Sequence, residues 1–317
     1  MSLRAPFPWF GGKSRVAPLV WDHFGNVPNY VEPFFGSGAV LLGRPHEPKV
    51  ETVNDLDAFV SNWWRAVAAI PEEVAAWADW PVNEADMLAR HKALIADTEF
   101  RQRLRTDPDY YDVRVAGWWA WGLNIWIGDG WCRHEAEQLP HLGNPGTGIN
   151  RRLPHLGNPG TGRPEKILDW FEALADRMRD VRVCCGEWDR VLGESVTIKH
   201  GVTAVFLDPP YESFEDTYAV KTEVATPVRE WCIANGDNPL LRIALCGYDG
   251  QHELPTSWDC VHWKARKGYQ KVDADGNHGG ENECVWFNRS CLRQNTLFDF
   301  PVAEPEDEPI EVAEATE

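Results

Sequence analysis

Long apolar runs are missing from this sequence of 317 residues. No stretch approaches the roughly 18 consecutive apolar residues that a membrane-spanning helix needs. The N-terminal segment, MSLRAPFPWFGGK, also contains no apolar core of a secretory signal. We therefore expect a cytoplasmic protein that has no membrane partner.

Cysteine pairs at metal-binding spacing are absent as well. None of the eight cysteines forms a Cys-x-x-Cys pair: Cys184 and Cys185 are adjacent, and the others are scattered. Structural zinc sites usually draw on such pairs. The spacing therefore predicts reduced thiols and no metal site.

Positive charge is scarce, since the net charge is −18. Residues 301–317 carry seven acidic residues and no basic one, so residues 1–300 carry −11. We expect this last segment to be a disordered acidic tail. Any surface that binds nucleic acid must then be a local basic patch.

The rest of the composition is that of a folded protein. Hydrophobic residues make up 43% of the chain and charged residues 25%, which is ordinary for a globular domain. The 17 tryptophans are unusual. Tryptophan fills cores, and it is also a good surface on which a planar ring can stack.

The N-terminal part, residues 1–71, shows the alternation of an α/β domain. The expected elements are a helix over Ser14–Phe24, a strand at Tyr30–Val31 that stops at Pro33, a helix over Ala39–Leu42, a strand over Lys49–Val53 and a helix ending at Ile70. A strand, a glycine turn, a helix, a second strand and an acidic residue form half of a nucleotide-binding βαβ unit.

Residues 72–164 differ from what precedes them. Short helices are expected over Glu72–Trp80, Glu84–Ala96, Arg101–Arg105 and Val113–Ile127. Two identical copies of LPHLGNPGTG follow, at Leu139–Gly148 and Leu153–Gly162. Two copies are too few for a solenoid, so we expect turn-rich loops. We interpret residues 72–164 as an inserted region.

The α/β pattern resumes after Pro164. The expected elements are a helix over Glu165–Met178, strands over Val181–Cys185 and Thr203–Leu207, a helix over Pro227–Asn235, and strands over Arg242–Cys246, Cys260–Lys264 and Cys284–Phe287. Residues 1–71 and 165–300 therefore form one α/β domain that the inserted region interrupts.

Two glycine-rich segments open helices near the N-terminus. In Trp9-Phe10-Gly11-Gly12-Lys13 the backbone could approach an anion, although a plain loop with a solvated lysine is the simpler alternative. Glu32-Pro33-Phe34-Phe35-Gly36-Ser37-Gly38 lacks the third glycine of a dinucleotide fingerprint and the Lys-Ser/Thr of a P-loop. The turn still allows close approach of a ligand to the backbone.

Acidic residues follow three of the expected strands. Asp55 could bind both hydroxyls of a ribose, or simply cap the next helix. Glu187 could accept a hydrogen bond from an adenine amino group while Trp188 packs on the ring, although a surface glutamate beside a core tryptophan is the commoner case. Asp208 is the third of these acidic residues and begins a proline-rich segment.

The segment Asp208-Pro209-Pro210-Tyr211 directly follows the apolar strand Thr203–Leu207. Two prolines fix the backbone and remove two N–H donors. The result is a rigid carboxylate, an acceptor carbonyl and an aromatic face within four residues. Such a set can bind a planar amine, by accepting from its two N–H groups and stacking on its ring. The alternative is a rigid turn with Tyr211 in the core.

Taken together and in order, WFGGK, VEPFFGSG, VNDLD, a long insert, CGEW and DPPY resemble the Dam-type S-adenosylmethionine-dependent DNA adenine-N6 methyltransferases. The resemblance covers residues 7–70 and 165–290. It implies an α/β fold, with a Rossmann-like seven-stranded methyltransferase sheet and a mostly helical inserted target-recognition domain. The duplicated loops are similar to those of phage-borne enzymes, which implies a phage or prophage origin.

The resemblance also implies roles for individual residues. Those expected at the cofactor are Trp9, Gly11, Gly12, Lys13, Glu32, Pro33, Phe34, Gly36, Gly38, Asp55, Glu187, Trp188 and Asp208. Those expected to receive the target base are Asp208, Pro209, Pro210 and Tyr211. The sequence departs from the family at Asp57, where asparagine is common.

The resemblance implies fewer residues for DNA contacts than for the cofactor. Leu123-Asn124-Ile125 and Gly130-Trp131-Cys132-Arg133 look like a diverged form of the family's LNR…NGLYR segment, but Ile125 replaces its arginine. Asn124 and Arg133 are therefore expected at DNA, as are Arg151 and Arg152 between the duplicated loops. Further basic residues group at Arg101, Arg103 and Arg105, at Arg163 and Lys166, and at Lys264, Arg266, Lys267 and Lys271.

The implied activity is transfer of a methyl group from S-adenosylmethionine to N6 of a flipped-out adenine in a specific double-stranded DNA sequence, without a metal. An RNA adenine or a protein glutamine is an alternative acceptor. A non-catalytic DNA-binding module that merely binds the cofactor is a further alternative. The recognition sequence, a partner restriction endonuclease and the oligomeric state are not predicted.

Overall fold

A computed structural model describes residues 3–9, 11–107, 109–127, 131–132, 148–149, 164–210, 224–263 and 283–292. Its elements are α1 (Ala17–Phe24), β1 (Asn29–Glu32), α2 (Ala39–Leu42), β2 (Val50–Asp55), α3 (Ala58–Ala69), α4 (Pro71–Ala78), α5 (Glu84–Ala96), α6 (Thr98–Thr106), α7 (Val113–Ile125), β3 (Trp126–Ile127), β4 (Gly148–Ile149), α8 (Pro164–Met178), β5 (Val181–Cys185), the 3₁₀ helices η1 (Trp188–Val191) and η2 (Ile198–His200), β6 (Thr203–Leu207), α9 (Ala225–Asn235), β7 (Leu241–Tyr248), β8 (Asp259–Trp263) and β9 (Glu283–Phe287).

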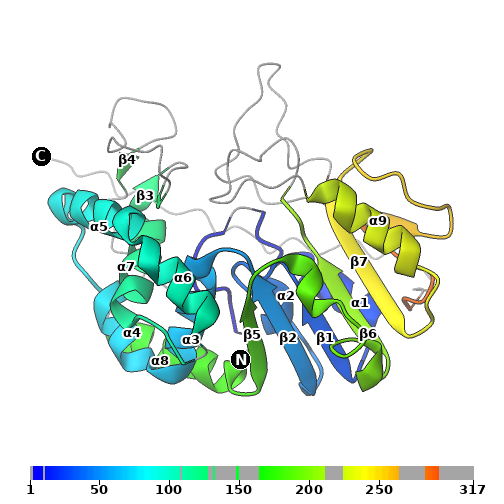
Figure 1. Cartoon of the computed structure of the whole chain (residues 1–317), viewed down its shortest axis with the longest axis horizontal. Coiled ribbons are helices and arrows are strands. Elements are labelled where there is room, and N and C mark those ends of the chain that lie inside the picture. The colour runs from blue at the N-terminus through cyan, green and yellow to red at the C-terminus, as the bar shows by residue number, and fades with distance from the viewer. Residues whose placement is uncertain are drawn as a thin grey trace, which may run out of the picture.

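Seven strands form one mixed sheet in the order β5-β2-β1-β6-β7-β9-β8 (Figure 1). The first five of these run parallel, and β9 runs antiparallel to both β7 and β8. The predicted seven-stranded α/β fold is thereby confirmed. From the neighbouring strands β1 and β6 the chain winds outward in opposite directions, so a topological switch point lies between them. Open α/β sheets bind ligands at that point, outside the carboxyl ends of the strands.

Burial explains which strands are central. All five residues of β6 are buried, as expected for a strand covered on both faces. The edge strand β8 instead carries exposed residues along its length. The two-stranded pair β3–β4 is separate and joins Trp126–Ile127 to Gly148–Ile149. Apart from Gly148, the duplicated LPHLGNPGTG copies lie outside the described residues, as does the acidic tail.

Helix starts follow local chemistry. The helix α3 is capped by Asp57, whose carboxylate accepts from the Phe59 N–H at 2.8 Å. The alternative in which Asp55 is the cap is therefore wrong. The helix α1 begins at Ala17 and not at Ser14, because Pro18 has no N–H to donate to the preceding turn. No helix in the described ranges combines the length and apolarity needed to cross a membrane.

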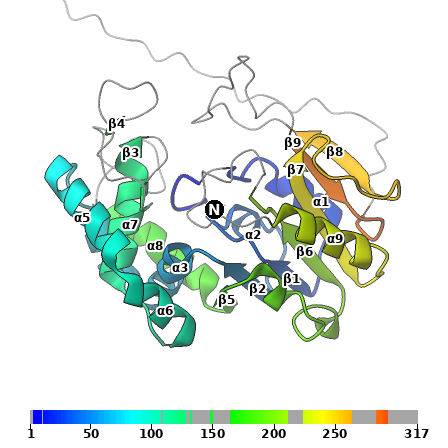
Figure 2. The same ribbon diagram turned by 45° about the horizontal axis from the view of Figure 1, so that its top comes forward.

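The helices of residues 72–164 pack directly on the α/β part. In Figures 1 and 2, α4–α7 gather beside α3 and α8 at the β5 end of the sheet, whereas α9, β8 and β9 lie at the other end. Aromatic contacts cross between the two parts: the Phe7 ring lies 5.1 Å from that of Trp63 and 4.9 Å from that of Trp119. One continuous core therefore serves both parts, and the division into domains stays a prediction.

Candidate active site

The turn after β1 is fixed by packing. Gly36 and Gly38 have positive φ angles of 47° and 69°, which favour glycine. A Cβ on Gly36 would also lie 2.4 Å from Nε1 of Trp9. The sequence suggested that these glycines leave room for a ligand at the backbone. At Gly36, however, the neighbour that excludes a side chain is Trp9, so the segment around Trp9 packs onto this turn.

Glu32 lies beneath the turn, inside the sheet. Its carboxyl group is buried and accepts a 2.8 Å hydrogen bond from the hydroxyl of Tyr30. Burial raises the pKa of Glu32 well above its usual range, although the bond from Tyr30 acts in the opposite direction. The expected place of Glu32 beneath the cofactor remains a prediction.

Asn54 of β2 joins two loops, and sequence reasoning missed it. This buried amide donates to the carbonyl of Pro33 at 3.1 Å and to that of Gly186 at 2.9 Å. The backbone carbonyl of Asn54 accepts from the N–H of Phe35 at 3.0 Å. The loops after β1 and β5 are thus both bound to the end of β2. No sequence signal marks this role, because it depends on strands that pair across the sheet.

Asp55 ends β2 and faces the turn after β1. One carboxylate oxygen accepts from the N–H of Gly36 and the other from the N–H of Asp57, both at 2.8 Å. Burial first and the charge of the neighbouring Asp57 second raise the pKa of Asp55 to about 7. Each oxygen retains a second lone pair, so the carboxylate can still accept from a ribose. That role stays a prediction.

The loop after β5 places Glu187 and Trp188 beside Asp55. The N–H of Gly186 donates to the Asp55 carbonyl at 3.1 Å. Glu187 is exposed, whereas Trp188 is half-buried and stacks on Phe34, with ring centroids 6.2 Å apart and 21° between the planes. Predicted cofactor residues from three strand ends therefore lie together around Asn54.

Asp208 follows β6 and forms an ion pair with Lys13. The Lys13 ammonium lies 2.9 Å from Oδ1 of Asp208, 3.8 Å from Oε2 of Glu283 and 2.7 Å from the Gly11 carbonyl oxygen. The structure thereby joins the WFGGK segment to the Asp-Pro-Pro corner. Pro209 is buried and Pro210 half-buried, whereas Tyr211 lies outside the described residues.

The ammonium of Lys13 is buried among acidic groups, with a side chain only 4% exposed. Burial alone would lower its pKa, but the negative charges around it, Asp208 first, raise the pKa above its ordinary value. Lys13 is therefore charged and orients the Asp208 carboxylate. Glu283 is a further member of this cluster. It begins the strand β9, and sequence reasoning missed it because only pairing of β9 with β7 brings it here.

The residues expected at DNA are less completely described. Asn124 is half-buried in α7, and its amide donates to the Ala120 carbonyl of the same helix at 2.8 Å. Arg133, Arg151 and Arg152 lie outside the described residues, as do the basic groups at residues 163 and 264–271. On α6, Arg103 contacts the Asp107 carboxylate at 3.5 Å. The DNA-contact roles therefore stay predictions.

Fold and site together define a class. The strand order, with polar turns at the carboxyl ends of β1, β2, β5 and β6, is consistent with an α/β methyltransferase fold. Residues 9–123 match the family model of the D12 class N6 adenine-specific DNA methyltransferases. This match indicates an adenine-specific DNA methyltransferase and confirms the predicted enzyme class. None of the curated proteins matches the chain.

Proposed function

We propose that this enzyme transfers a methyl group from S-adenosylmethionine to N6 of an adenine flipped out of a specific double-stranded DNA sequence. The observation that carries the proposal is the Asp208-Pro209-Pro210 corner beside the switch point, with Asp208 held by buried Lys13. Because Val31 of β1 pairs with Val205 of β6, the two loops leave the sheet side by side. A methyl donor bound over the loop after β1 would then adjoin a base bound at the loop after β6.

The residues around Asn54 fit a nucleoside-bearing methyl donor. The half-buried rings of Phe34 and Trp188 offer apolar surface to an adenine, and the exposed Glu187 can accept from its amino group. Asp55 can accept from ribose hydroxyls. S-adenosylmethionine, when bound, supplies an electrophilic methyl group on a sulfonium.

Asp208 and Pro209 are assigned to the target amine. The N6 lone pair of adenine is delocalised into the ring, so the free base is a poor nucleophile. When the Asp208 carboxylate and the Pro209 carbonyl accept from the two N6–H groups, the nitrogen is drawn towards tetrahedral geometry and its lone pair becomes available. Fixed acceptors of this kind also stabilise the positive charge that develops on N6.

The N6 proton leaves through the same residue. As the new C–N bond forms, N6 becomes acidic, so the Asp208 carboxylate need not be a strong base to accept the proton. The Lys13 ammonium, 2.9 Å from Oδ1, keeps the carboxylate in place throughout. Flipping the base costs a few kcal/mol of unstacking, which DNA contacts must offset.

A transfer assay with three acceptors tests this proposal. The purified chain is incubated with methyl-labelled S-adenosylmethionine and with duplex DNA, RNA or a glutamine-containing protein. We expect label in duplex DNA, recovered after digestion as N6-methyladenine. Label in RNA or protein but not in DNA would contradict the proposal. Binding of the cofactor and DNA without any transfer would instead support a non-catalytic module.

Cofactor binding is expected to depend on pH through Asp55. Its pKa is raised to about 7, so the ionised form that accepts from ribose dominates only at higher pH. Affinity for S-adenosylhomocysteine, measured by calorimetry, should therefore weaken by about tenfold between pH 8 and pH 6.

The variant Asp57→Asn provides the matched control for this pH dependence. Asparagine still caps α3, but the variant removes the neighbouring charge that contributes to the raised pKa of Asp55. The midpoint of the pH dependence of S-adenosylhomocysteine affinity should therefore move to lower pH in this variant. An affinity that stays constant from pH 6 to pH 8 in the wild type would show that the Asp55 carboxylate does not bind the cofactor.

A further inference from the structure

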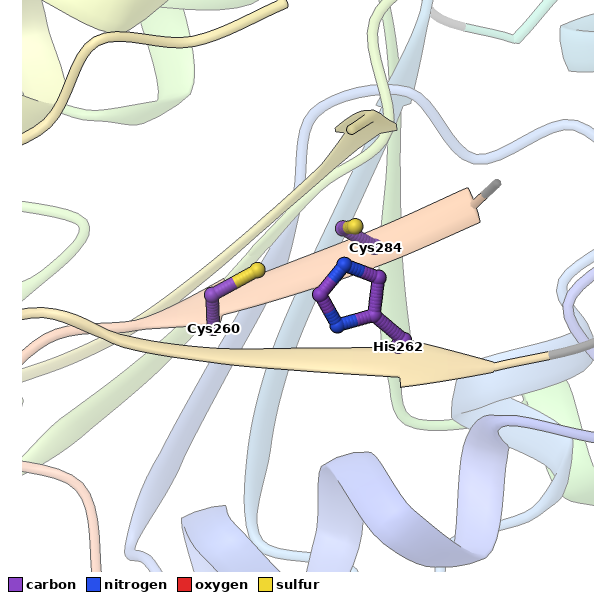
Figure 3. A group of neighbouring side chains, drawn as sticks. All are labelled: Cys260, His262 and Cys284. Atoms are coloured by element: carbon purple, nitrogen blue, oxygen red, sulfur yellow. The ribbon is translucent and has the colours of Figure 1, made fainter. Parts of the chain in front are cut away.

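Three side chains at the far end of the sheet gather around one point. Cys260 and His262 come from β8, and Cys284 comes from β9 (Figure 3). One potential ligand atom from each, two thiol sulfurs and an imidazole nitrogen, all lie within 4.8 Å of one another.

Strand pairing produces this cluster. His262 is directly opposite Cys284 in the antiparallel ladder, and Cys260 precedes His262 by two residues. Residues two apart on a strand share a face, so all three side chains lie on one face of the β8–β9 pair. The sequence analysis predicted no metal site, because it considered only cysteines that are close in sequence.

The donor atoms suit zinc. Two thiols and one imidazole are common zinc ligands, with bonds of about 2.3 Å to sulfur and about 2.0–2.1 Å to nitrogen. Such bonds place neighbouring ligand atoms of a tetrahedral site about 3.3–3.8 Å apart. The separations of up to 4.8 Å in this cluster therefore need to contract by only about 1 Å around the ion.

A carboxylate adjoins one of the three ligands. Oδ2 of Asp249 lies 3.4 Å from Nε2 of His262. Asp249 follows β7 directly, so it reaches the cluster from a third strand. The distance of its oxygen from His262 equals the spacing of two neighbouring tetrahedral ligands, but Asp249 is not among the residues whose ligand atoms all lie within 4.8 Å of one another, so it would have to move towards the two cysteines to bind the ion.

We propose that Cys260, His262 and Cys284 form a structural zinc site, in which Asp249 supplies the fourth ligand. The site ties the edge strand β8 to β9 and to the end of β7. On the next pair of the same ladder, Trp263 is opposite Glu283. Both approach Lys13, whose ammonium lies 3.8 Å from Glu283 and 5.8 Å from the Trp263 ring. Zinc would thus stabilise the ends of β8 and β9 that lie beside Lys13.

Metal binding by the full chain tests this proposal. The protein is stripped of metal with a chelator under thiol reductant and then titrated with Co²⁺ and with Zn²⁺. We expect one equivalent of either ion, thiolate-to-cobalt absorption in the near ultraviolet, and a dissociation constant for Zn²⁺ at or below about 1 μM. Zn²⁺ should also raise the melting temperature.

Variants assign the ligands. Cys260→Ser and His262→Ala should each weaken Zn²⁺ binding at least tenfold and remove the rise in melting temperature. Both residues are exposed on an edge strand, so their replacement is not expected to unfold the protein. The controls Cys184→Ser and His200→Ala lie outside the cluster and should bind Zn²⁺ as the wild type does. A wild type without stoichiometric binding, or binding that survives both ligand variants, would overturn the proposal.

Discussion

Replacing Asp208 with alanine is expected to lower the rate of methyl transfer to DNA by about a thousandfold or more, while the protein still folds. The variant removes the carboxylate that accepts from N6 and leaves the rest of the site in place. The folded state should persist because the Asp208 side chain is 20% exposed and Lys13 still faces Glu283. The measurement is single-turnover transfer of labelled methyl to duplex DNA.

Two controls separate chemistry from binding in this experiment. Cofactor affinity of the Asp208→Ala variant should fall far less than its transfer rate, because Asp55, Phe34 and Trp188 are unchanged. Asp208→Asn keeps the size and one acceptor oxygen but loses the charge. Its transfer rate should therefore lie between those of the wild type and Asp208→Ala. A folded Asp208→Ala enzyme that transfers methyl at the wild-type rate would rule out the proposed role.

Replacing Lys13 with methionine is expected to lower the free energy of unfolding by about 3–5 kcal/mol, the usual cost of breaking a buried ion pair. Lys13 is 4% exposed and Glu283 3% exposed, so water cannot replace the lost ammonium. Asp208 and Glu283 would then repel each other across the vacated space. Chemical denaturation measures this loss, and methyl transfer should also fall because Asp208 is no longer oriented.

A second variant and a surface control test whether the loss of stability comes from breaking a buried ion pair. In Lys13→Met/Glu283→Gln one of the two carboxylates is neutralised, so part of the lost stability should return, whereas transfer should stay low. Arg179→Met breaks an ion pair of similar length, 2.8 Å, but both of its side chains are more than 70% exposed. This control should show no measurable change. Equal losses in the two single variants would contradict the role of burial.

Local signals were enough to predict most elements. Helix α5 and strands β5 and β6 occur with the predicted bounds, because a cap at Asn83 marks the helix and runs rich in apolar or β-branched residues mark the strands. The start of α1 was predicted three residues early. The prediction followed the spacing of apolar residues, which does not show that Pro18 lacks an N–H. The seven-stranded sheet was expected only from the family resemblance, and the order of its strands was not predicted.

The site was predicted in parts and not as a whole. Asp55 and Asp208 were identified because each follows a strand whose carboxyl end must lie at one edge of the sheet. The Lys13–Asp208 ion pair and the Asn54 bridge were not predictable in this way, since each joins segments that are distant in sequence. The Cys260–His262–Cys284 cluster was missed for the same reason, because it depends on the pairing of β8 with β9.

A structure of the enzyme with S-adenosylhomocysteine and a duplex that contains its methylation site tests the central assignment most directly. The account predicts an adenine outside the helix stack, with N6 about 3 Å from both the Asp208 carboxylate and the Pro209 carbonyl. An adenine whose N6 faces other groups, or a cofactor bound away from the turn after β1, would contradict it.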